Sequence, residues 1–448
     1  MKRRSFLTSS AAAAFGFQVV APHVLRAQGG GNTPNNKIRI AAIGCGGRGS
    51  ANLDGLAGED IVALCDVDDR NAAGSFKKFP NAQRFKDFRK MMDISDSFDA
   101  VLVATPDHTH YVACMAAMER GKHVYCEKPL AHTVAEVRGM RKKALEKKII
   151  TQVGNQGHSS HSIRSFVEMV QSGVIGKVTE VHAGCDAFKN VYACGDQRAG
   201  LKKKAEVPKE LDWDLWLGPV PHRDYSPMYV PFNWRGYTAF GTGCIGDWVC
   251  HVLDPSFWAL DLDMPTAITA ETRGYNPKED AEFYPKGSRI TFEFPAKGDR
   301  GPVKIIWHDG EFSIPRPDDL GKDMRVEGTG AVIIGEKGKI MHGSHGAGSP
   351  RIITQELLKG WKRPEEKITR IKNGNHHQDF LTAVRENRQA GSSFEYGGAL
   401  TEIGLLGMIA IRRSGKRLEW DAKAMKFTND EEANQFLTPA YREGWGKV

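Results

Sequence analysis

Two side chains that can move a proton stand four residues apart in the second half of the chain. Asp247 and His251 lie in the segment 241–254, which we expect to be helical, so that both face one side. A histidine held near a carboxylate can take the proton of a hydroxyl group while a hydride leaves the same carbon. The two could also be metal ligands, but no third ligand stands at metal-site spacing and His-Glu-x-x-His is absent. We therefore predict proton transfer and no metal.

Lys128 is a third candidate because it comes directly after a predicted strand. Glu127-Lys128-Pro129 follows the strand over 123–126, and Thr105-Pro106-Asp107-His108-Thr109-His110 follows the strand over 100–104. Both segments then lie at the carboxyl edge of a parallel sheet, where ligands bind in this architecture. A lysine there can hold a substrate hydroxyl or relay a proton. Taken alone, the two segments would also fit an exposed loop lysine and a Pro-Asp turn before a helix.

A glycine motif precedes both segments. Gly44-x-Gly46-x-x-Gly49 directly follows the apolar run 38–43, and a second apolar run ends at Asp66, 22 residues after Gly44. Gly44 would make the tight turn, Gly46 would let the backbone approach a pyrophosphate, and Gly49 would let the helix pack close to the strand. The helix N-terminus then faces the phosphates. Asp66 would accept hydrogen bonds from the adenosine ribose and repel a 2′-phosphate, so we expect NAD rather than NADP.

Alternating strands and helices position these motifs within residues 37–155. Further strands are predicted over 100–104, 123–126 and 149–153, and helices over 110–120 and 134–147. This alternation of strands and helices predicts an α/β Rossmann domain with a doubly wound parallel sheet.

The alternation of strands and helices ends after residue 155, and residues 156–448 are predicted to form a second domain. A helix over 160–172 is followed by strands over 178–183, 267–271, 289–294 and 303–307 and by helices over 376–388 and 398–414. These segments predict a C-terminal α+β domain with a large, mostly antiparallel open sheet.

The first 36 residues have a different character. Arg3-Arg4-Ser5-Phe6-Leu7, an alanine-rich apolar run and Leu25-Arg26-Ala27 predict a twin-arginine signal peptide over 1–27, and a linker without hydrophobic pattern over 28–36. An uncleaved amphipathic anchor is the alternative. We expect a periplasmic or exported protein. No other segment approaches the ~18 apolar residues of a membrane span.

Charge and cysteine content exclude some classes of protein. Removal of residues 1–27 would halve the formal charge of +8, so nucleic acid is not an expected partner. The eight cysteines include no Cys-x-x-Cys pair, which argues against a zinc ribbon or a dithiol redox site. Cys185 and Cys194 lie near predicted loops and could pair after export.

Aromatic residues are frequent around Asp247 and His251. Most should be core, but some could form an apolar platform for a sugar ring. The group comprises Trp213, Trp216, Tyr225, Tyr229, Phe232, Trp234, Tyr237, Trp248 and Trp258.

Taken together and in this order, the glycine loop, 105–110, Glu127-Lys128-Pro129 and Asp247-x-x-x-His251 resemble the glucose–fructose oxidoreductase / inositol dehydrogenase (Gfo/Idh/MocA) family. Trp213–Leu217 with Gly218-Pro219, and the segment 231–236, look like its exported branch. The resemblance implies a sugar or polyol substrate and a homo-oligomer, dimer or tetramer, formed through the C-terminal sheet. It also implies a catalytic trio of Lys128, Asp247 and His251.

The resemblance and the motifs together give the full set of expected site residues. Those expected at the cofactor are Gly44, Gly46, Gly47, Arg48, Gly49, Asp66, Thr105, Pro106, Asp107, His110, Glu127, Lys128, Asn155, Gln156, Trp234 and Arg235. Those expected at the substrate are Lys128, His158, Tyr237, Asp247 and His251.

Export and a nicotinamide cofactor together constrain the chemistry. An exchangeable cofactor would be lost outside the inner membrane, so it must be bound before export at roughly −12 kcal/mol or tighter. Our leading hypothesis is an NAD-dependent oxidoreductase that acts on a saccharide or glycoside. In it His251 is the general base, Asp247 orients His251, and Lys128 polarises the same oxygen. The alternatives are a redox-neutral NAD-dependent glycoside hydrolase, which oxidises the ring transiently and eliminates the substituent, and a non-catalytic sugar-binding module.

Overall fold

The computed structural model describes residues 37–193, 195 and 198–446. The predicted signal peptide (1–27), the predicted linker (28–36) and Cys194 lie outside these described residues.

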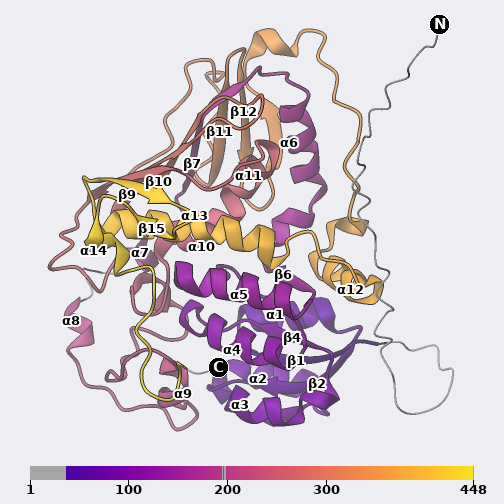
Figure 1. Cartoon of the computed structure of the whole chain (residues 1–448), viewed down its shortest axis with the longest axis vertical. Helices are drawn as coiled ribbons and strands as arrows, with labels where there is room; N and C mark the ends of the chain where they lie inside the picture. Colours follow the sequence, from indigo (N-terminus) through magenta and orange to yellow (C-terminus); the bar gives the residue numbers. More distant parts are fainter. Residues whose placement is uncertain (1–36, 194, 196–197, 447–448) are drawn as a thin grey trace, which may run out of the picture. The chain divides into compact units, whose positions relative to one another are not determined.

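A six-stranded parallel sheet forms the first unit of the fold (Figure 1). Its strand order is β3-β2-β1-β4-β5-β6 with every neighbouring pair parallel, which is the predicted doubly wound arrangement. Buried apolar residues on both faces explain why its central strands read as continuous apolar runs. The strands are β1 (Arg39–Ile43), β2 (Asp60–Cys65), β3 (Gln83–Phe85), β4 (Ala100–Val103), β5 (His123–Cys126) and β6 (Thr151–Val153).

Helices cover both faces of this sheet. Apolar residues of α4 and α5 pack in one hydrophobic cluster, and those of α1 and α2 pack in another on the opposite face. Helix α4 begins three residues before the predicted start, because Pro106 occupies its N-cap and Asp107 its first turn, where an acid suits the helix dipole. The helices are α1 (Arg48–Leu56), α2 (Asp69–Lys78), α4 (Asp107–Glu119) and α5 (Val134–Glu146).

A nine-stranded sheet forms the second unit, in the order β13-β12-β11-β7-β10-β9-β8-β14-β15. Strands β7 and β10 pair in parallel and the other neighbours are antiparallel, which confirms the predicted mostly antiparallel sheet. The four predicted strands are present as β7 (Val178–Cys185), β8 (Ala267–Arg273), β9 (Gly287–Phe294) and β10 (Val303–Gly310). Those not predicted are β11 (Gly330–Gly335), β12 (Lys339–Gly343), β13 (Gly348–Ile352), β14 (Arg417–Asp421) and β15 (Lys426–Phe427).

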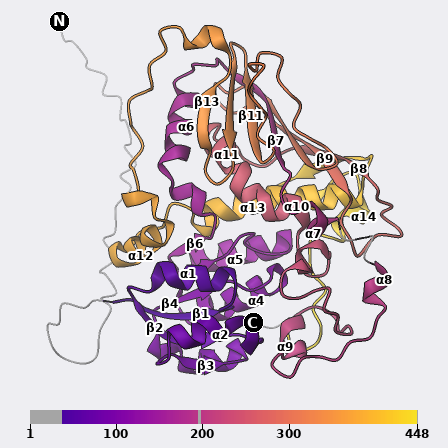
Figure 2. The same ribbon diagram turned by 180° about the vertical axis from the view of Figure 1, so that it is seen from behind.

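Helices α10 and α13 lie between the two sheets in both views (Figures 1 and 2). Helix α13 contacts α5 on one side and strands β8 and β9 on the other. Its length and composition would allow it to cross a membrane, so the expectation that no segment other than the N-terminal one approaches such a span was wrong. In the structure, however, 83% of its most apolar 18-residue window is buried inside the protein. The helices on this side are α6 (His161–Gln171), α10 (Gly243–Val252), α11 (Asp254–Ala259) and α13 (Phe394–Arg412).

Helix α12 (His376–Glu386) comes late in the chain but packs on the first sheet (Figure 1). Its residues Phe380, Leu381 and Val384 belong to the same hydrophobic cluster as Ile40 and Leu53. The order of elements in the sequence placed this helix with the second domain, whereas its apolar face covers the sheet of the first.

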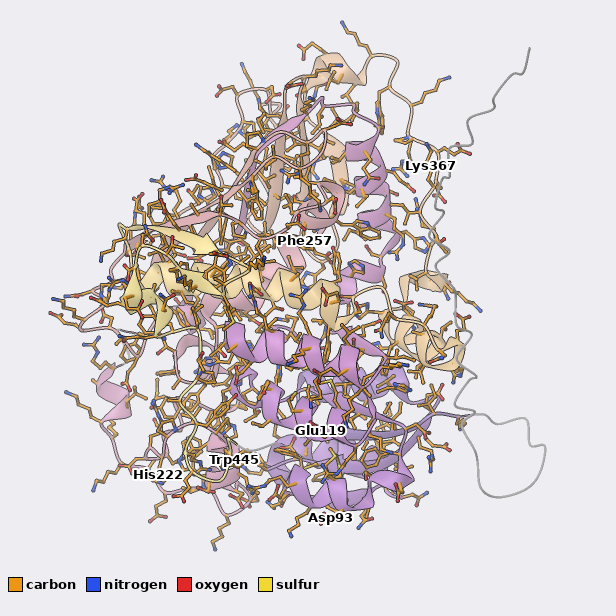
Figure 3. All side chains as sticks on the ribbon, viewed as in Figure 1. Asp93, Glu119, His222, Phe257, Lys367 and Trp445 are labelled. Atoms are coloured by element: carbon orange, nitrogen blue, oxygen red, sulfur yellow. The ribbon has the colours of Figure 1, made fainter. Side chains whose placement is uncertain are left out.

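The C-terminal segment also returns to the first unit. Trp445 lies beside α9 (Figure 3), where its ring contacts Phe88 at 6.1 Å and the guanidinium of Arg89 at 4.4 Å. Arg442 binds the carbonyl oxygens of Asp214 and Gly218. These contacts hold the segment 213–220 against the C-terminal segment, and two of its residues, Leu215 and Trp216, line the cavity described below.

The remaining helical segments are short. They are α3 (Phe88–Met91), α7 (Lys189–Tyr192), α8 (Arg198–Leu201), α9 (Trp213–Leu217), α14 (Glu431–Asn434), and the 3₁₀ turns η1 (Met92–Ser97), η2 (Gln156–Ser159), η4 (Asn233–Gly236), η5 (Gln355–Leu358) and η6 (Lys372–Gly374).

Seven cysteines fall within the described residues, and all seven are buried free thiols. Cys185 is one of them. Its predicted pairing partner, Cys194, is outside the described part of the chain, so that pairing stays a prediction.

Candidate functional site

A cavity of about 640 Å³ opens at the carboxyl edge of the parallel sheet and reaches α10. It is lined by these predicted site residues: Gly44, Gly46, Gly47, Arg48, Asp66, Thr105, Pro106, Asp107, Glu127, Lys128, Trp234, Arg235, Asp247 and His251. The structure therefore brings the glycine motif and the three expected catalytic residues together in one cavity.

The glycine loop has the close approaches that its sequence predicts. Gly44 has a φ of +82°, and a Cβ there would lie 2.6 Å from the carbonyl oxygen of Ala104. A Cβ on Gly49 would lie 2.0 Å from the carbonyl oxygen of Gly44. Larger side chains are excluded at both positions, because α1 packs directly on the turn that leads into it.

Helix α1 begins after Gly47 without a side-chain cap. Helices α2, α5 and α6, in contrast, are capped by Asp68, Thr133 and Ser160. Among the described residues no side chain caps the positive end of α1, and Gly47 and Arg48 at this end line the cavity. This arrangement fits the pyrophosphate of a dinucleotide.

Asp66 directly follows β2 and lines the same cavity. Its carboxylate accepts hydrogen bonds from the backbone N–H groups of Cys45 at 2.7 Å and Asp68 at 2.9 Å. Burial raises the pKa of Asp66, and these two hydrogen bonds oppose that shift. Lys86, a cation of the cavity wall, forms an ion pair with Asp69 at 2.9 Å. The acidic end of β2 therefore suits a ribose with free hydroxyls.

Lys128 and Asp247 form a largely buried ion pair. The Lys128 Nζ donates hydrogen bonds to the Asp247 Oδ1 at 2.6 Å and to the Asp247 carbonyl oxygen at 3.0 Å. Burial raises the pKa of Asp247, but the charges of Lys128 and Arg235 outweigh it and leave the pKa below its ordinary value. An ammonium group has three donors, so one N–H of Lys128 remains for a ligand oxygen.

Tyr192 and Arg235 hold the other oxygen of Asp247. The Tyr192 hydroxyl donates to Asp247 Oδ2 and accepts a hydrogen bond from Trp248 Nε1 at 2.9 Å. The Arg235 Nε lies 3.5 Å from the same oxygen. Asp247 therefore positions Lys128. The expectation that it orients His251 is corrected, because its carboxylate is engaged by these other groups.

His251 packs against a second histidine. The rings of His251 and His345 stack with centroids 4.2 Å apart and planes at 24°, and the backbone N–H of His345 donates to the carbonyl oxygen of His251 at 2.9 Å. Burial, then the charges of Lys128 and His345, lower the pKa of His251 well below its usual value. Its Nδ1 is buried without a hydrogen-bond partner among the described residues. The imidazole is thus neutral and able to accept a proton.

Asp107 adds a second carboxyl group to the cavity wall. It accepts a hydrogen bond from the Thr242 hydroxyl at 2.9 Å. Burial, together with the nearby charge of Asp247, raises the pKa of Asp107 to about 7. Near neutral pH this group can therefore carry a proton while Asp247 stays ionised.

Glu127 joins the glycine loop to the next strand. Its Oε1 accepts hydrogen bonds from Asn52 at 2.8 Å, from Gln156 at 3.0 Å and from Arg48 at 3.3 Å. The guanidinium of Arg48 also binds the Gln156 side chain. Gln156 itself does not line the cavity. It contacts Arg48 and Glu127, which do line it.

Two residues that were expected at the cofactor, His110 and Asn155, connect parts of the protein instead. The ring of His110 lies between the carbonyl oxygens of Thr105 and Pro129, each at 2.8 Å, and joins the two loops that they belong to. Asn155 is fully buried and binds Asp254 and Ser392. Their polar atoms are engaged inside the protein, so the expectation of cofactor contact is corrected for both.

The expected substrate residues His158 and Tyr237 do not reach this cavity. His158 binds Asp254 at 3.0 Å, stacks on Trp258 at 4.8 Å and lines a separate cavity. Tyr237 is 1% exposed and belongs to the aromatic cluster around Tyr229. Both side chains pack elsewhere in the protein. The expectation that His158 and Tyr237 contact the substrate is therefore corrected.

An aromatic rim surrounds the Lys128 end of the cavity. Phe188 contacts the rings of Phe232 at 5.4 Å and Trp248 at 6.2 Å, and Trp234 also lines the wall. Phe188 is 52% exposed and Phe232 39% exposed, although both are large apolar side chains. Of the other aromatic residues noted in the sequence, Trp213, Tyr229 and Tyr237 are core. The rim is the part that can serve as an apolar platform.

Sequence reasoning missed Tyr192, Phe188 and His345. The first two stand in the segment 188–192, whose only regular element is a four-residue helix. His345 lies in the turn between β12 and β13, with a φ of +54° that few non-glycine residues adopt. A histidine inside the glycine-rich run 343–348 was the signal for it.

No group of three or more His, Cys, Asp or Glu side chains is placed to hold a metal ion in the part of the chain that the structure describes.

Two family models match the chain. Residues 38–155 match the model described as "Oxidoreductase family, NAD-binding Rossmann fold", and residues 159–311 match its "C-terminal alpha/beta domain".

Two curated relatives are similar to this chain. One is the inositol 2-dehydrogenase/D-chiro-inositol 3-dehydrogenase of Lacticaseibacillus casei, 30% identical over 33% of this chain and 44% of that protein. The other is the levoglucosan dehydrogenase of Pseudarthrobacter phenanthrenivorans, 25% identical over 43% of this chain and 40% of that protein. The alignments thus span less than half the length of each relative.

Solved structures share the fold over most of both chains. The WlbA dehydrogenase of Bordetella pertussis, in complex with NADH and UDP-GlcNAcA, superposes with a TM-score of 0.60 over 86% of this chain and 99% of its own at 16% identity. The two matched family models, which together span residues 38–155 and 159–311, show that the chain belongs to the Gfo/Idh/MocA oxidoreductase family with an NAD-binding Rossmann fold.

Proposed function

We propose that this protein is an NAD-dependent oxidoreductase that acts on a sugar or glycoside. The observation that carries the proposal is the single cavity in which Lys128, Asp247 and His251 lie beside the glycine loop and Asp66. The inositol and levoglucosan dehydrogenases to which the chain is similar support a carbohydrate substrate.

Each part of the cavity has a role in this reaction. The uncapped start of α1 and the close-packed glycine turn would hold the pyrophosphate, and Asp66 would accept the ribose hydroxyls. A bound nicotinamide would supply the hydride acceptor. The acidic end of β2 favours NAD over NADP, because a 2′-phosphate would meet Asp66 and Asp68 there.

The substrate hydroxyl would lie between Lys128 and His251. The neutral imidazole of His251 takes the hydroxyl proton, and the free N–H of Lys128 stabilises the negative charge that develops on the same oxygen. Asp247 keeps the ammonium group in place, and Tyr192 and Arg235 fix Asp247. The rim formed by Phe188, Phe232 and Trp248 would support the apolar face of a sugar ring.

The test is a turnover assay with the purified full chain and a panel of aldoses, polyols and aryl glycosides. We expect formation of NADH with at least one sugar, and loss of this activity in Lys128→Ala. Release of the aglycone without lasting reduction of NAD would favour the glycoside hydrolase instead. Saturable sugar binding without turnover in either assay would leave only a binding module.

Two further expectations join the proposal. The paired arginines at residues 3–4 and the apolar run after them support export through the twin-arginine pathway.

Ile306 of β10 pairs with Thr291 and His182 on one face of the larger sheet, and all three are half-buried. That face supports a homo-oligomer formed through the C-terminal sheet. N-terminal sequencing of a periplasmic fraction and mass photometry of the purified chain would check these points.

A further inference from the structure

A second cavity, of about 220 Å³, lies on another side of α4 from the cofactor cavity. It is lined by residues of α4, α5, α13, the segment 219–223 and the C-terminal segment 435–441. Its apolar wall includes Val220, Met408 and Phe436, and its polar groups include His108, Arg223 and Arg412. A cavity of about 150 Å³ holds a benzene ring, so this volume is sufficient for a six-carbon molecule.

His108 lines this cavity and carries an unpartnered acceptor. The residue is 2% exposed, and its Nε2 lies 2.9 Å from the carbonyl oxygen of Trp216. A carbonyl oxygen only accepts, so the proton is on Nε2 and Nδ1 carries a lone pair. That Nδ1 is buried and has no hydrogen-bond partner within the described ranges. Burial lowers the pKa of His108 to about 3, so the ring stays neutral and needs a donor such as a hydroxyl group.

Two arginines that line the same cavity carry unused donors. The Nε atoms of Arg223 and Arg412 are both buried without a partner among the residues described in the structure. Arg223 also lies 3.6 Å from Glu282, whereas Arg412 stacks on Phe436 at 4.7 Å and forms no ion pair with any described carboxylate. Arg412 is therefore a cation beside a cavity without a counterion, which an anionic ligand would supply.

The carboxyl group of Glu136 does not fill that role. It accepts hydrogen bonds from the Thr133 backbone and hydroxyl at 2.9 Å and from the Tyr441 hydroxyl at 2.6 Å. Burial raises the pKa of Glu136 to about 7. Below that pH the group is protonated and uncharged, so it neither pairs with Arg412 nor repels an anion in the cavity.

We propose that this cavity binds a small hydroxylated carboxylate, such as an aldonic or uronic acid. The carboxylate would pair with Arg412 and accept from Arg223, a hydroxyl group would donate to His108 Nδ1, and the carbon chain would lie against Val220 and Phe436. The site is separate from the cofactor cavity and does not depend on the proposed reaction. It adjoins that cavity through α4, because Asp107 lines one cavity and His108 lines the other.

The test is isothermal titration of the full chain, saturated with NADH, with D-gluconate. D-glucose, which lacks the carboxylate, and hexanoate, which lacks the hydroxyl groups, are the matched ligands. We expect gluconate to bind at least about tenfold more tightly than either. Arg412→Met should weaken gluconate binding about tenfold or more, and Arg120→Met should leave it unchanged. Arg120 is the control because it lies at the other end of α4, on the Ala116 carbonyl oxygen, outside the cavity.

Variants in the cofactor cavity separate this site from the proposed active site. His251→Ala should bind gluconate as the parent does. If Arg412→Met does not fold, Arg223→Met replaces it in the same comparison. The proposal is overturned if gluconate does not bind at millimolar concentration. It is equally overturned if binding is lost in His251→Ala but kept in Arg412→Met, or if hexanoate binds as tightly as gluconate.

Discussion

The Lys128 ammonium group donates to both the carbonyl oxygen and the Oδ1 of Asp247, at 3.0 and 2.6 Å. These two residues stand 119 positions apart in the chain, and the contact joins the end of β5 to the middle of α10. It fixes the lysine at the point where the glycine loop, the aromatic rim and His251 meet.

Asp247→Asn should lower kcat by roughly 100-fold, with a smaller effect on KM. The amide cannot hold the ammonium group as a carboxylate does, so the transition state loses more stabilisation than the bound substrate does. Steady-state kinetics of the variant measure both constants. Tyr192→Phe is the graded control and should lose less, because Arg235 still faces Asp247 Oδ2. Equal activity of Asp247→Asn and the parent would remove the ion pair from the mechanism.

His345→Ala should move the acid limb of the kcat/KM profile to higher pH. Burial and the neighbouring His345 help to keep the pKa of His251 low, and the base must be neutral to accept a proton. Removing the stacked ring admits water, so the pKa of His251 rises toward its ordinary value. A pH–rate profile of both proteins gives the two midpoints. An unchanged or lowered midpoint would contradict the assigned role of His345.

Asp66→Ser should weaken NADH binding about tenfold and reduce the preference for NADH over NADPH. The carboxylate is the expected partner of the ribose hydroxyls and the source of repulsion toward a 2′-phosphate. Fluorescence titration with the two nucleotides measures the ratio. Asp54→Asn, at an exposed position of α1 paired with Lys78 and outside the cavity, is the matched control and should keep the parent ratio. A variant at Asp66 with unchanged discrimination would place cofactor selection elsewhere.

Gly49→Ala and Gly74→Ala should change stability in opposite directions, although both glycines lie in helices. A Cβ on Gly49 would meet the Gly44 carbonyl oxygen at 2.0 Å, whereas one on Gly74 in α2 has no atom within 4 Å. We expect Gly49→Ala to lose about 2–4 kcal/mol of unfolding free energy. Gly74→Ala should gain about 0.5–1 kcal/mol. Urea unfolding measures both, and a loss at Gly74 as large as at Gly49 would contradict the close packing of α1.

Asp107 should make the protein less stable as the pH rises from about 4 to about 7. Burial raises the pKa of Asp107 to about 7 in the folded state, while the unfolded carboxyl titrates near 3.8. Between these values the folded state binds one more proton, so its free energy of unfolding falls by on the order of 4 kcal/mol and is constant above. Asp107→Asn removes this slope. Unfolding midpoints of parent and variant at pH 5 and pH 8 give the difference, and equal pH dependence of the two proteins would contradict the shift.

Local patterns predicted the first domain well. The apolar runs of β1, β4 and β5 and the spacing of Gly44, Gly49 and Asp66 report directly on local structure, and the structure confirms the predicted strands, the glycine turn and the parallel order. The four-residue spacing of Asp247 and His251 also placed both on one helix. These features depend on residues close together in the sequence.

Contacts between distant segments explain what was missed. Strands β11 and β12 are short apolar runs bounded by glycine, and β13 contains a serine and a proline, so they were not predicted, yet all three pair at one end of the larger sheet. His345 reaches His251 only because the turn between β12 and β13 folds back on α10. Asn155 and His158 follow β6 at the expected edge, but Asp254 of α11 binds both and draws them away from the cavity.

Mass spectrometry of the denatured, freshly purified full chain shows whether the cavity beside the glycine loop holds a nicotinamide dinucleotide. We expect about one equivalent of NAD or NADH to be released per chain, or to be taken up with high affinity if purification has removed it. A protein that releases no nucleotide, and that takes up neither NAD nor NADP when titrated, would not be a nicotinamide-dependent enzyme.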